Sequence, residues 1–336
     1  MSDAILTLEH VDVGFDTDDG SVSAVSDVSL SVAAGEIFGL VGESGCGKTT
    51  LAMATMGLLP VSATVSGSVR FQGRELVGLP PEDLRRLRGD RISMVFQDPM
   101  TSLDPAFPIG EQIAETITAH SDVQRSHARD RALALLADVG IPEPERRYGD
   151  APHRLSGGMR QRVVIATALA NEPALMLADE PTTALDVTIQ SQILDLLRDL
   201  RQRLRTTIVL ITHDLGVIAQ LCDRVGVMYA GQLVEIATVS EIFRAPRHPY
   251  TQALLAALPT HHQEPGSLRV IPGRVPNLIA PPPGCRFASR CPHVMDVCTI
   301  VPPLAHESAD HLIACWLSEA TREAGRPTGA ATGGAA

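Results

Sequence analysis

The chain has 336 residues, of which 44% are hydrophobic, and a formal net charge of −11 with a sequence pI of about 5.4. This acidic balance argues against nucleic acid as the main partner, because proteins that bind nucleic acid usually present a basic face. The start of the chain lacks the features of a signal peptide, and no apolar run approaches the ~18–20 residues that a membrane span needs. We therefore expect a cytoplasmic protein with one large domain and an appendage, or with two domains.

Apolar runs and helical periodicity alternate along the first 240 residues. The expected strands cover residues 5–13, 22–32, 37–41, 68–72, 92–96, 174–178, 207–212, 225–229 and 232–236. The expected helices cover residues 50–59, 80–88, parts of 108–140, 156–170 and a stretch that begins at 186, where Asp186 can serve as the N-cap. This alternation predicts a largely parallel α/β sheet. We expect residues 98–170 to form a helical insertion between strands.

The sequence Gly42-Glu43-Ser44-Gly45-Cys46-Gly47-Lys48-Thr49 reads G-x-x-x-x-G-K-T, which is the phosphate-binding loop called Walker A. An apolar strand precedes it and a helix follows it, as the motif requires. Glycines let backbone N–H groups curl around an anion, and the start of the helix adds its positive end. Lys48 is placed to reach the β- and γ-phosphates of a nucleotide, and the Thr49 hydroxyl to bind Mg²⁺.

Polar residues follow three of the later strands. Asp179 and Glu180 come after the apolar run 175–178, which predicts a Mg²⁺-binding carboxylate followed by a group that orients or deprotonates water. His213 follows the strand 207–212 and could contact the γ-phosphate, although a histidine after a strand is more often an ordinary loop residue. Ligands bind at the carboxyl ends of such strands, so Gln97, Asp179, Glu180 and His213 should collect beside the glycine loop.

These motifs occur in one order: Gly42–Thr50, Gln97, Leu155–Gln161, Leu175–Glu180, 184–186 and 212–214. Over about residues 5–240 they resemble the ATP-binding subunit of an ABC transporter. The most specific element is Leu155-Ser156-Gly157-Gly158-Met159-Arg160-Gln161, which matches the signature sequence of that family. The resemblance implies a P-loop NTPase cassette with a mixed sheet core, an antiparallel β part and a helical subdomain.

The resemblance also implies a role for each matching residue. Phe15 would stack on adenine, Gln97 would touch Mg²⁺ or the lytic water, Asp179 would serve the metal, Glu180 the water and His213 the γ-phosphate. Ser156 and Gly158 would close over ATP bound by a second ATPase subunit, which we expect to be a paralogue. The phosphates would be cradled by the loop residues Gly42, Ser44, Gly45, Cys46, Gly47, Lys48, Thr49 and Thr50; the Cys46 thiol itself is expected to be incidental.

The composition changes near residue 244. The stretches 247–251, Ile271-Pro272-Gly273 and Gly284–Pro292 are similar to the tail of the ATPases of oligopeptide and dipeptide (and nickel) importers. The expected division is a cassette over 1–243, a C-terminal domain over 244–318, and a disordered tail over 319–336. The implied partners are the second ATPase, two membrane permeases and an extracytoplasmic binding protein, with this chain on the cytoplasmic face of the membrane.

Four cysteines cluster in the C-terminal part with the spacing C-x5-C-x6-C-x16-C: Cys285, Cys291, Cys298 and Cys315. In a cytosolic chain such a cluster favours a metal site over disulfides. The wide spacing and the proline after Cys291 suit a [4Fe–4S] cluster better than zinc, and the resemblance to the dipeptide branch points the same way. Zinc, unliganded thiols and a disulfide remain alternatives.

The sequence thus predicts a Mg²⁺-dependent ATPase that powers uptake of di- or oligopeptides. The same engine could serve nickel, another small solute or export of antimicrobial peptides, because fold and engine do not determine cargo. A soluble ABC protein that acts on ribosomes or DNA is a further alternative, which the single cassette and the acidic balance disfavour.

Overall fold

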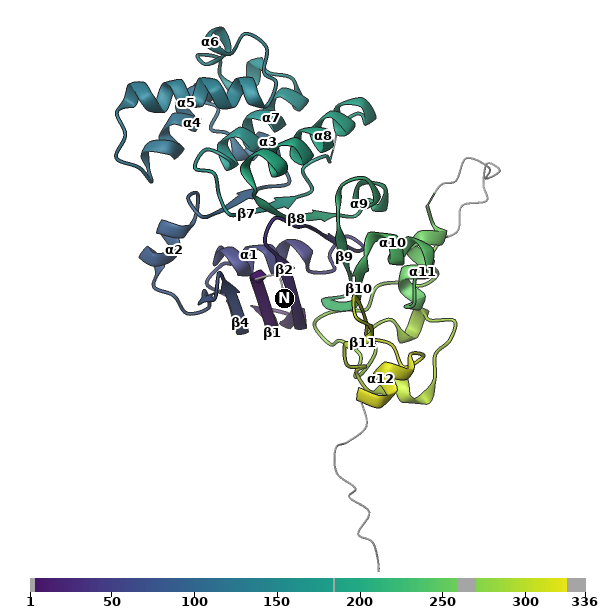
Figure 1. Ribbon diagram of the computed structural model, residues 1–336. Helices are drawn as coiled ribbons and strands as arrows, with labels where there is room; N and C mark the ends of the chain where they lie inside the picture. The colour runs from purple at the N-terminus through teal and green to yellow at the C-terminus, as the bar shows by residue number, and fades with distance from the viewer. Residues whose placement is uncertain (1–3, 184, 259–269, 325–336) are drawn as a thin grey trace, which may run out of the picture.

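An antiparallel sheet forms the N-terminal part of the computed structural model, which describes residues 4–183, 185–258 and 270–324. Its strand order is β2-β1-β4-β5 (Figure 1). Alternate apolar residues of β1, such as Leu6, Leu8, Val11 and Val13, are buried, which is the pattern of a sheet with one covered face. The bounds are β1 (Ala4–Thr17), β2 (Gly20–Ala33), β4 (Ala63–Phe71) and β5 (Arg74–Glu75).

The larger sheet has the strand order β11-β12-β10-β9-β3-β8-β7-β6. The pairs from β9 to β6 are parallel, whereas β9, β10, β12 and β11 pair antiparallel, so the expected parallel sheet is one side of a mixed one. The central strands β3, β7 and β8 are buried along their whole length. The bounds are β3 (Ile37–Val41), β6 (Ile92–Val95), β7 (Leu175–Asp179), β8 (Thr207–Thr212), β9 (Arg224–Tyr229), β10 (Gln232–Thr238), β11 (Ala305–Ser308) and β12 (His311–Ile313).

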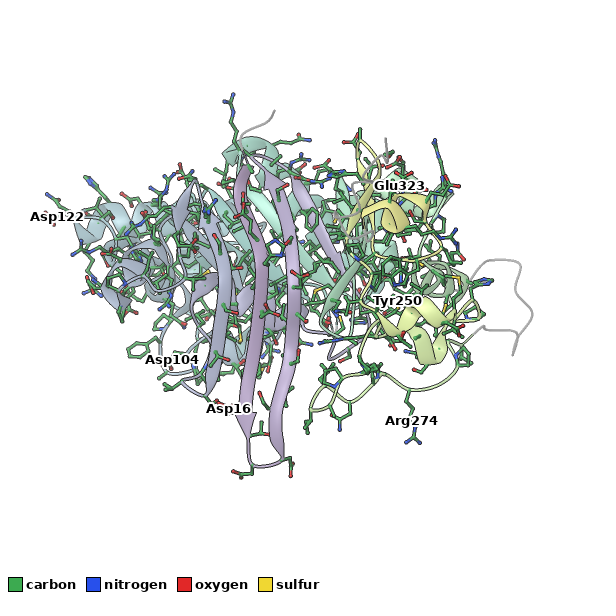
Figure 2. The ribbon with its side chains drawn as sticks, turned by 90° about the horizontal axis from the view of Figure 1, so that it is seen from below. Asp16, Asp104, Asp122, Tyr250, Arg274 and Glu323 are labelled. Carbon is green, nitrogen blue, oxygen red and sulfur yellow. The ribbon has the colours of Figure 1, made fainter. Side chains whose placement is uncertain are left out.

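The helical insertion lies to one side of both sheets (Figures 1 and 2). Ile109, Ile113 and Ile117 are buried in its core, as their spacing along one helix face predicts. The insertion consists of α3 (Pro99–Ser102), α4 (Ile109–Thr118), α5 (Arg125–Asp138), α6 (Pro144–Arg147), the 3₁₀ turn Pro152–Arg154 and α7 (Gly157–Ala168).

The remaining helices of the cassette connect its strands. Asp186 caps α8, since its Oδ1 accepts a hydrogen bond from the Ile189 N–H at 3.0 Å, and this expectation is confirmed. These helices are α1 (Lys48–Met56), α2 (Pro81–Leu87), α8 (Val187–Leu204), α9 (Leu215–Leu221) and α10 (Val239–Arg244), and α11 (Pro249–Ala256) follows in the C-terminal part. No helix in the described ranges is long and apolar enough to cross a bilayer.

The C-terminal part is hydrogen-bonded to the cassette. Strand β12 pairs with β10, so the chain after residue 300 extends the main sheet. The 3₁₀ turns Ala288–Arg290 and Asp296–Thr299 precede β11, and α12 (Glu319–Ala324) follows β12. Residues 319–324 therefore differ from the expected disordered tail, because the buried Thr321 donates a hydrogen bond to the Ile313 carbonyl at 3.1 Å. Residues 325–336 lie outside the described residues.

A buried polar group fixes the start of α11. The His248 Nδ1 accepts a hydrogen bond from the Tyr250 N–H at 3.0 Å, so His248 caps this helix in a neutral form. The buried carboxylate of Glu235 accepts from the backbone N–H groups of Arg247 and His248 and contacts His311 at 2.7 Å. Burial lowers the pKa of His248 to about 4, from an ordinary value of 6.5.

We predict that His248 makes stability fall below neutral pH. Its pKa is lower in the folded chain than in the unfolded chain, so the unfolded chain binds more protons between pH 6.5 and about 4. The free energy of unfolding should therefore decrease as the pH falls through this window, by up to about 3 kcal/mol from this group. The replacement His248→Asn retains a capping oxygen and does not titrate. Urea unfolding at pH 7 and pH 5 should show a smaller loss in His248→Asn than in the wild type; equal losses would contradict the assignment.

Candidate nucleotide-binding site

The phosphate loop lies between β3 and α1, as the sequence predicts. Lys48 is buried, and its Nζ donates hydrogen bonds to the carbonyl oxygens of Gly42 at 2.8 Å and Glu43 at 3.1 Å. The ammonium group is thus held inside the curve of the loop. Because Lys48 is also the first residue of α1, a cation and the positive end of a helix occupy the same place.

Two glycines of the loop are required by close contacts. A Cβ on Gly42 would lie 2.2 Å from the Met228 carbonyl oxygen, which belongs to the neighbouring strand β9. Gly47 has a φ of +98°, and a Cβ there would lie 2.5 Å from the Ala24 carbonyl oxygen. The loop is therefore packed against the β2 and β9 backbones, and a side chain at either position would displace it.

The polar residues that follow β6, β7 and β8 meet at one point, as predicted. The Glu180 carboxylate accepts hydrogen bonds from Gln97 Nε2 at 3.1 Å and Thr183 Oγ1 at 2.7 Å. Its Oε1 lies 3.0 Å from His213 Nδ1. Parallel strands bring their carboxyl ends to the same edge, so residues far apart in sequence converge there.

The pKa values of the two carboxylates of this cluster are shifted in opposite directions. Burial by itself would raise the pKa of Glu180, but hydrogen bonds from Thr183 and His213 outweigh it, and the net pKa is lowered. Glu180 is therefore ionised at neutral pH. Burial raises the pKa of Asp179, and a hydrogen bond from Thr49 offsets only part of this effect.

The surroundings of Asp179 fit a bound cation. Its Oδ1 is buried and has no hydrogen-bond partner among the described residues, which is costly unless another ligand satisfies it. The Thr49 hydroxyl is beside it and Lys48 contributes a nearby charge. Hydroxyl and carboxylate oxygens are the ligands that Mg²⁺ prefers.

The signature residues are in a different place from the phosphate loop. Ser156 is the N-cap of α7, and its Oγ accepts a hydrogen bond from the Met159 N–H at 3.3 Å. Gly158 lies against α8, where a Cβ would approach the Ile189 side chain to 2.6 Å. Within the described residues, no hydrogen bond joins Ser156 or Gly158 to the phosphate loop. Their arrangement leaves a capped helix N-terminus at the surface of the helical subdomain.

Two further predicted residues are Phe15, in the antiparallel sheet, and Cys46, in the phosphate loop. Phe15 lies within β1, paired with Val22 and Ala63, because β1 continues to Thr17, beyond the expected end of that strand at residue 13. Cys46 is buried, and its Sγ is 3.6 Å from Lys48 Nζ. Burial raises the pKa of the Cys46 thiol despite that neighbour.

The four C-terminal cysteines line one pocket together with His248, His293 and Trp316. Each cysteine of the described chain is free of disulfide bonds. Backbone N–H groups point at these sulfurs: His293 donates to Cys291 Sγ at 3.4 Å, and Met295 to Cys298 Sγ at 3.5 Å. Burial raises the pKa of Cys285 and of Cys315 to about 11. Although the sulfurs share this pocket, no group of three or more His, Cys, Asp or Glu side chains in the described ranges is arranged around a metal position.

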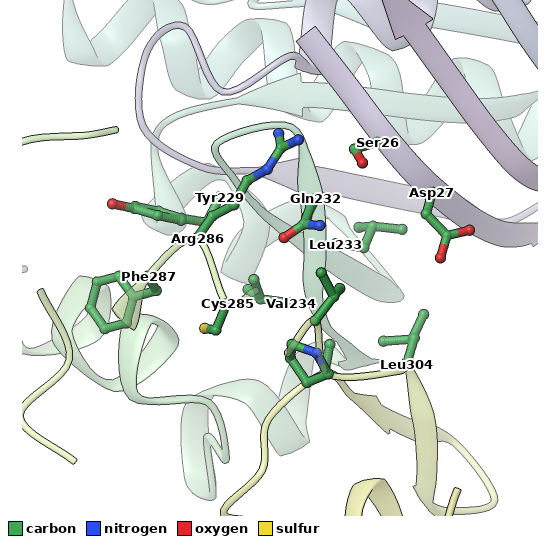
Figure 3. A pocket seen from close by; sticks show the side chains of 13 residues that line it. Ser26, Asp27, Tyr229, Gln232, Leu233, Val234, Cys285, Arg286, Phe287 and Leu304 are labelled. Atoms are coloured by element: carbon green, nitrogen blue, oxygen red, sulfur yellow. The ribbon is translucent and has the colours of Figure 1, made fainter. Parts of the chain in front are cut away.

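The contacts between the C-terminal part and the phosphate loop were not predicted from the sequence. Arg290 forms an ion pair with Glu43, and the Glu43 N–H donates to the Tyr250 hydroxyl at 3.0 Å. Figure 3 shows Arg286 between Tyr229 and Gln232, and its guanidinium group donates to the Ala230 carbonyl. The one sequence feature that could have indicated these contacts is the pair Arg286 and Arg290, which lies between Cys285 and Cys291.

The fold and this cluster of Lys48, Asp179, Glu180 and His213 define a nucleotide-hydrolysing cassette of the P-loop type. Residues 25–183 match the family model of the ABC transporter, and residues 234–298 match the model described as "Oligopeptide/dipeptide transporter, C-terminal region". Among solved structures, "Dimeric Structure of MJ0796, a Bacterial ABC Transporter Cassette" is similar with a TM-score of 0.63 and 29% identity, over 70% of this chain and 98% of that one.

Curated relatives are similar over nearly the whole chain. The oligopeptide transport ATP-binding protein OppD of Escherichia coli is 47% identical over 94% of both chains. The dipeptide transport ATP-binding protein DppD of Bacillus subtilis is 47% identical over 95% of this chain and 96% of its own length. The chain therefore belongs to the ATP-binding subunits of ABC transporters, in the oligopeptide/dipeptide family, and it is an ABC ATPase.

We predict that Gly42→Ala and Gly45→Ala differ sharply. Alanine at position 42 would clash with the β9 backbone, whereas a Cβ on Gly45 meets nothing within 4 Å. Gly45 has a φ of +78°, so its replacement should cost only about 1 kcal/mol. Urea unfolding without nucleotide should show a loss of about 3 kcal/mol or more for Gly42→Ala. Equal losses in the two variants would contradict the close packing of the loop on β9.

Proposed function

We propose that this chain hydrolyses ATP to power the import of dipeptides or oligopeptides across the cytoplasmic membrane. The observation that carries the proposal is the 47% identity to oligopeptide and dipeptide transport ATP-binding proteins along nearly the full length. The likeness includes the C-terminal region, since residues 234–298 match the model specific to oligopeptide and dipeptide transporters.

The geometry supports a division of labour in hydrolysis. Lys48 and the α1 N-terminus bind the β- and γ-phosphates, and Thr49 and Asp179 hold Mg²⁺, with Gln97 as a further ligand of the ion or the water. Bound Mg²⁺ neutralises phosphate charge. Glu180 is ionised and held by three side chains, so it can orient the attacking water and accept its proton. His213 contacts the γ-phosphate from the neighbouring strand end.

The complete site is shared between two subunits in this proposal. Phe15 stacks on the adenine of the chain's own ATP, bound by the whole loop from Gly42 to Thr50. Ser156 and Gly158 face the nucleotide of a second ATPase, a paralogue, where a capped helix N-terminus can meet the γ-phosphate. Their separation from the phosphate loop within one chain is what supports this assignment.

The helical insertion is the proposed contact with the two permeases. A broad surface pocket there is lined by residues of α4 and of the loop before it, including Leu103, Phe107 and Glu111. Met100 and Phe107 are exposed large apolar side chains on the same subdomain. Gln97 lies directly before α3 and bonds to Glu180, so a change at the γ-phosphate can reach this surface. The chain would thus be peripheral, on the cytoplasmic face of the membrane, with an extracytoplasmic protein delivering the peptide.

We propose further that residues 1–243 act as the cassette and 244–318 as a C-terminal module whose cysteines hold a [4Fe–4S] cluster. The support is chemical: four thiols line one pocket, and backbone N–H groups donate to the sulfurs of Cys291 and Cys298, as is common around cluster sulfur atoms. The side chains would have to move to surround a cluster, because no three of them in the described ranges are arranged around a metal position. The four ligands would be Cys285, Cys291, Cys298 and Cys315. Hydrolysis needs no redox step, so the cluster would be structural or regulatory.

Uptake of a labelled dipeptide or oligopeptide by cells tests the main proposal. We expect Glu180→Gln to bind ATP but to lose hydrolysis by about a hundredfold or more, because the group that activates water is gone. Peptide uptake should collapse with it. Glu172→Gln, which removes an exposed carboxylate, serves as the matched control and should retain uptake. Unchanged uptake in Glu180→Gln cells, with ATP hydrolysis by the purified wild-type protein, would mean that the cargo is not peptide.

Iron and acid-labile sulfide, assayed after anaerobic purification, test the cysteine site. We expect iron and sulfide in equal amounts, and their loss in Cys298→Ser. Cys222→Ala removes a cysteine outside the pocket and should retain both. Zinc without sulfide would contradict the cluster and indicate a zinc site. The absence of both iron and zinc would mean that the thiols bind no metal.

A further inference from the structure

A salt bridge joins the C-terminal module to the phosphate loop. Arg290 Nη1 donates to Glu43 Oε2 at 2.8 Å, and Arg290 Nη2 donates to Glu43 Oε1 at 3.1 Å. The side chain of Arg290 is 5% exposed and that of Glu43 is 26% exposed. A two-pronged, largely buried pair fixes geometry far better than a surface ion pair does.

Arg290 is itself held by the C-terminal module. Its Nε donates to the Pro272 carbonyl at 2.9 Å and its Nη2 to the Ile271 carbonyl at 3.2 Å. Glu43 is held at its backbone as well, since its N–H donates to the hydroxyl of Tyr250. The loop residue is therefore bound through both its main chain and its side chain by parts of the chain beyond residue 248.

The pair also balances charge at the nucleotide site. Glu43 places a carboxylate within a loop that binds a polyanion, and this charge would oppose ATP if it were left uncompensated. The hydrogen bond to Glu43 raises the pKa of Arg290, so the guanidinium stays charged. Arg290 thus neutralises the one acidic side chain of the loop Gly42–Thr49.

A second arginine of the same segment supports the loop from the other side. Arg286 Nη2 donates to Ser23 Oγ at 2.9 Å, and Nη1 donates to the Ala230 carbonyl in the β9–β10 turn. The next residue of that turn, Gly231, donates its N–H to the Cys46 carbonyl at 2.9 Å. The segment 286–290 therefore contacts the phosphate loop directly and through this turn.

We propose that the segment 286–290 sets the shape and charge of the phosphate loop, with Arg290 as a positioning residue that acts through Glu43. ATP binding and the conformation of the cysteine-bearing segment are then thermodynamically coupled, and the coupling is reciprocal. The proposal rests on ATP binding alone and requires neither a particular cargo nor a particular metal.

Equilibrium titration of the full chain with MgATP tests this coupling. Arg290→Ala leaves the Glu43 carboxylate uncompensated and should weaken ATP binding roughly tenfold. Adding Glu43→Gln to Arg290→Ala should recover most of the lost affinity, because the unbalanced charge is then gone. Arg290→Lys retains the charge but loses the two-pronged contact, so its loss should be smaller than that of Arg290→Ala. A further loss on adding Glu43→Gln would overturn the proposal.

Arg224→Ala is the matched control. Arg224 forms a comparable ion pair with Glu36 at 3.2 Å, with exposures of 26% and 7%, at the opposite end of β3 from the phosphate loop. The Arg224→Ala variant should have a lower free energy of unfolding but an ATP affinity within about twofold of wild type, since distant sites act independently. Equal weakening of ATP binding by Arg224→Ala and Arg290→Ala would show a general loss of stability and overturn the proposal.

Amide hydrogen exchange tests the same coupling in the wild-type chain, so the result does not depend on whether a variant folds. MgATP should slow exchange in residues 271–298 by more than in residues 305–313, because only the former segment contacts the loop. If ATP protects the loop peptide but leaves 271–298 unchanged, the coupling does not exist.

Discussion

The parallel pairing of β6, β7, β8 and β3 is the constraint on which the rest of the site depends. It brings four carboxyl ends to one edge, so that a lysine, two carboxylates, a glutamine and a histidine from distant parts of the sequence share one region. Because β3, β7 and β8 are buried along their whole length, this edge is closely packed. The charges are therefore arranged before any nucleotide arrives, and little reorganisation is needed in the reaction.

Most of this region could be predicted from sequence, since local patterns encode it. The glycine loop and the strand that ends in Asp179 each carry their own signal within about ten residues. Their meeting follows from one rule of parallel sheets. The contacts around Glu180 fit this reasoning, because Gln97 and His213 each come directly after a predicted strand.

The contacts made by the C-terminal module could not be predicted in the same way. Arg290 and Glu43 are 247 positions apart, and neither lies in a periodic pattern that would indicate the other. The addition of β12 to β10 involves three residues, too few for a recognisable strand signal. Long-range pairs of this kind depend on side-chain geometry, which hydrophobic periodicity does not report. The cysteines are the recognisable sequence feature of this segment, but the arginines between Cys285 and Cys291 are the residues that contact the phosphate loop and the β9–β10 turn.

The pairing of β12 with β10 affects the tendency of the cassette to aggregate. Strand β10 would otherwise be the last strand of the sheet, with a row of free backbone N–H and C=O groups. Its residues are almost entirely buried, and β12 and β11 cover this edge. A chain shortened after α10 would expose the free edge of β10, which is then able to pair with another copy. The C-terminal module thus also protects the cassette from aggregation through strand pairing.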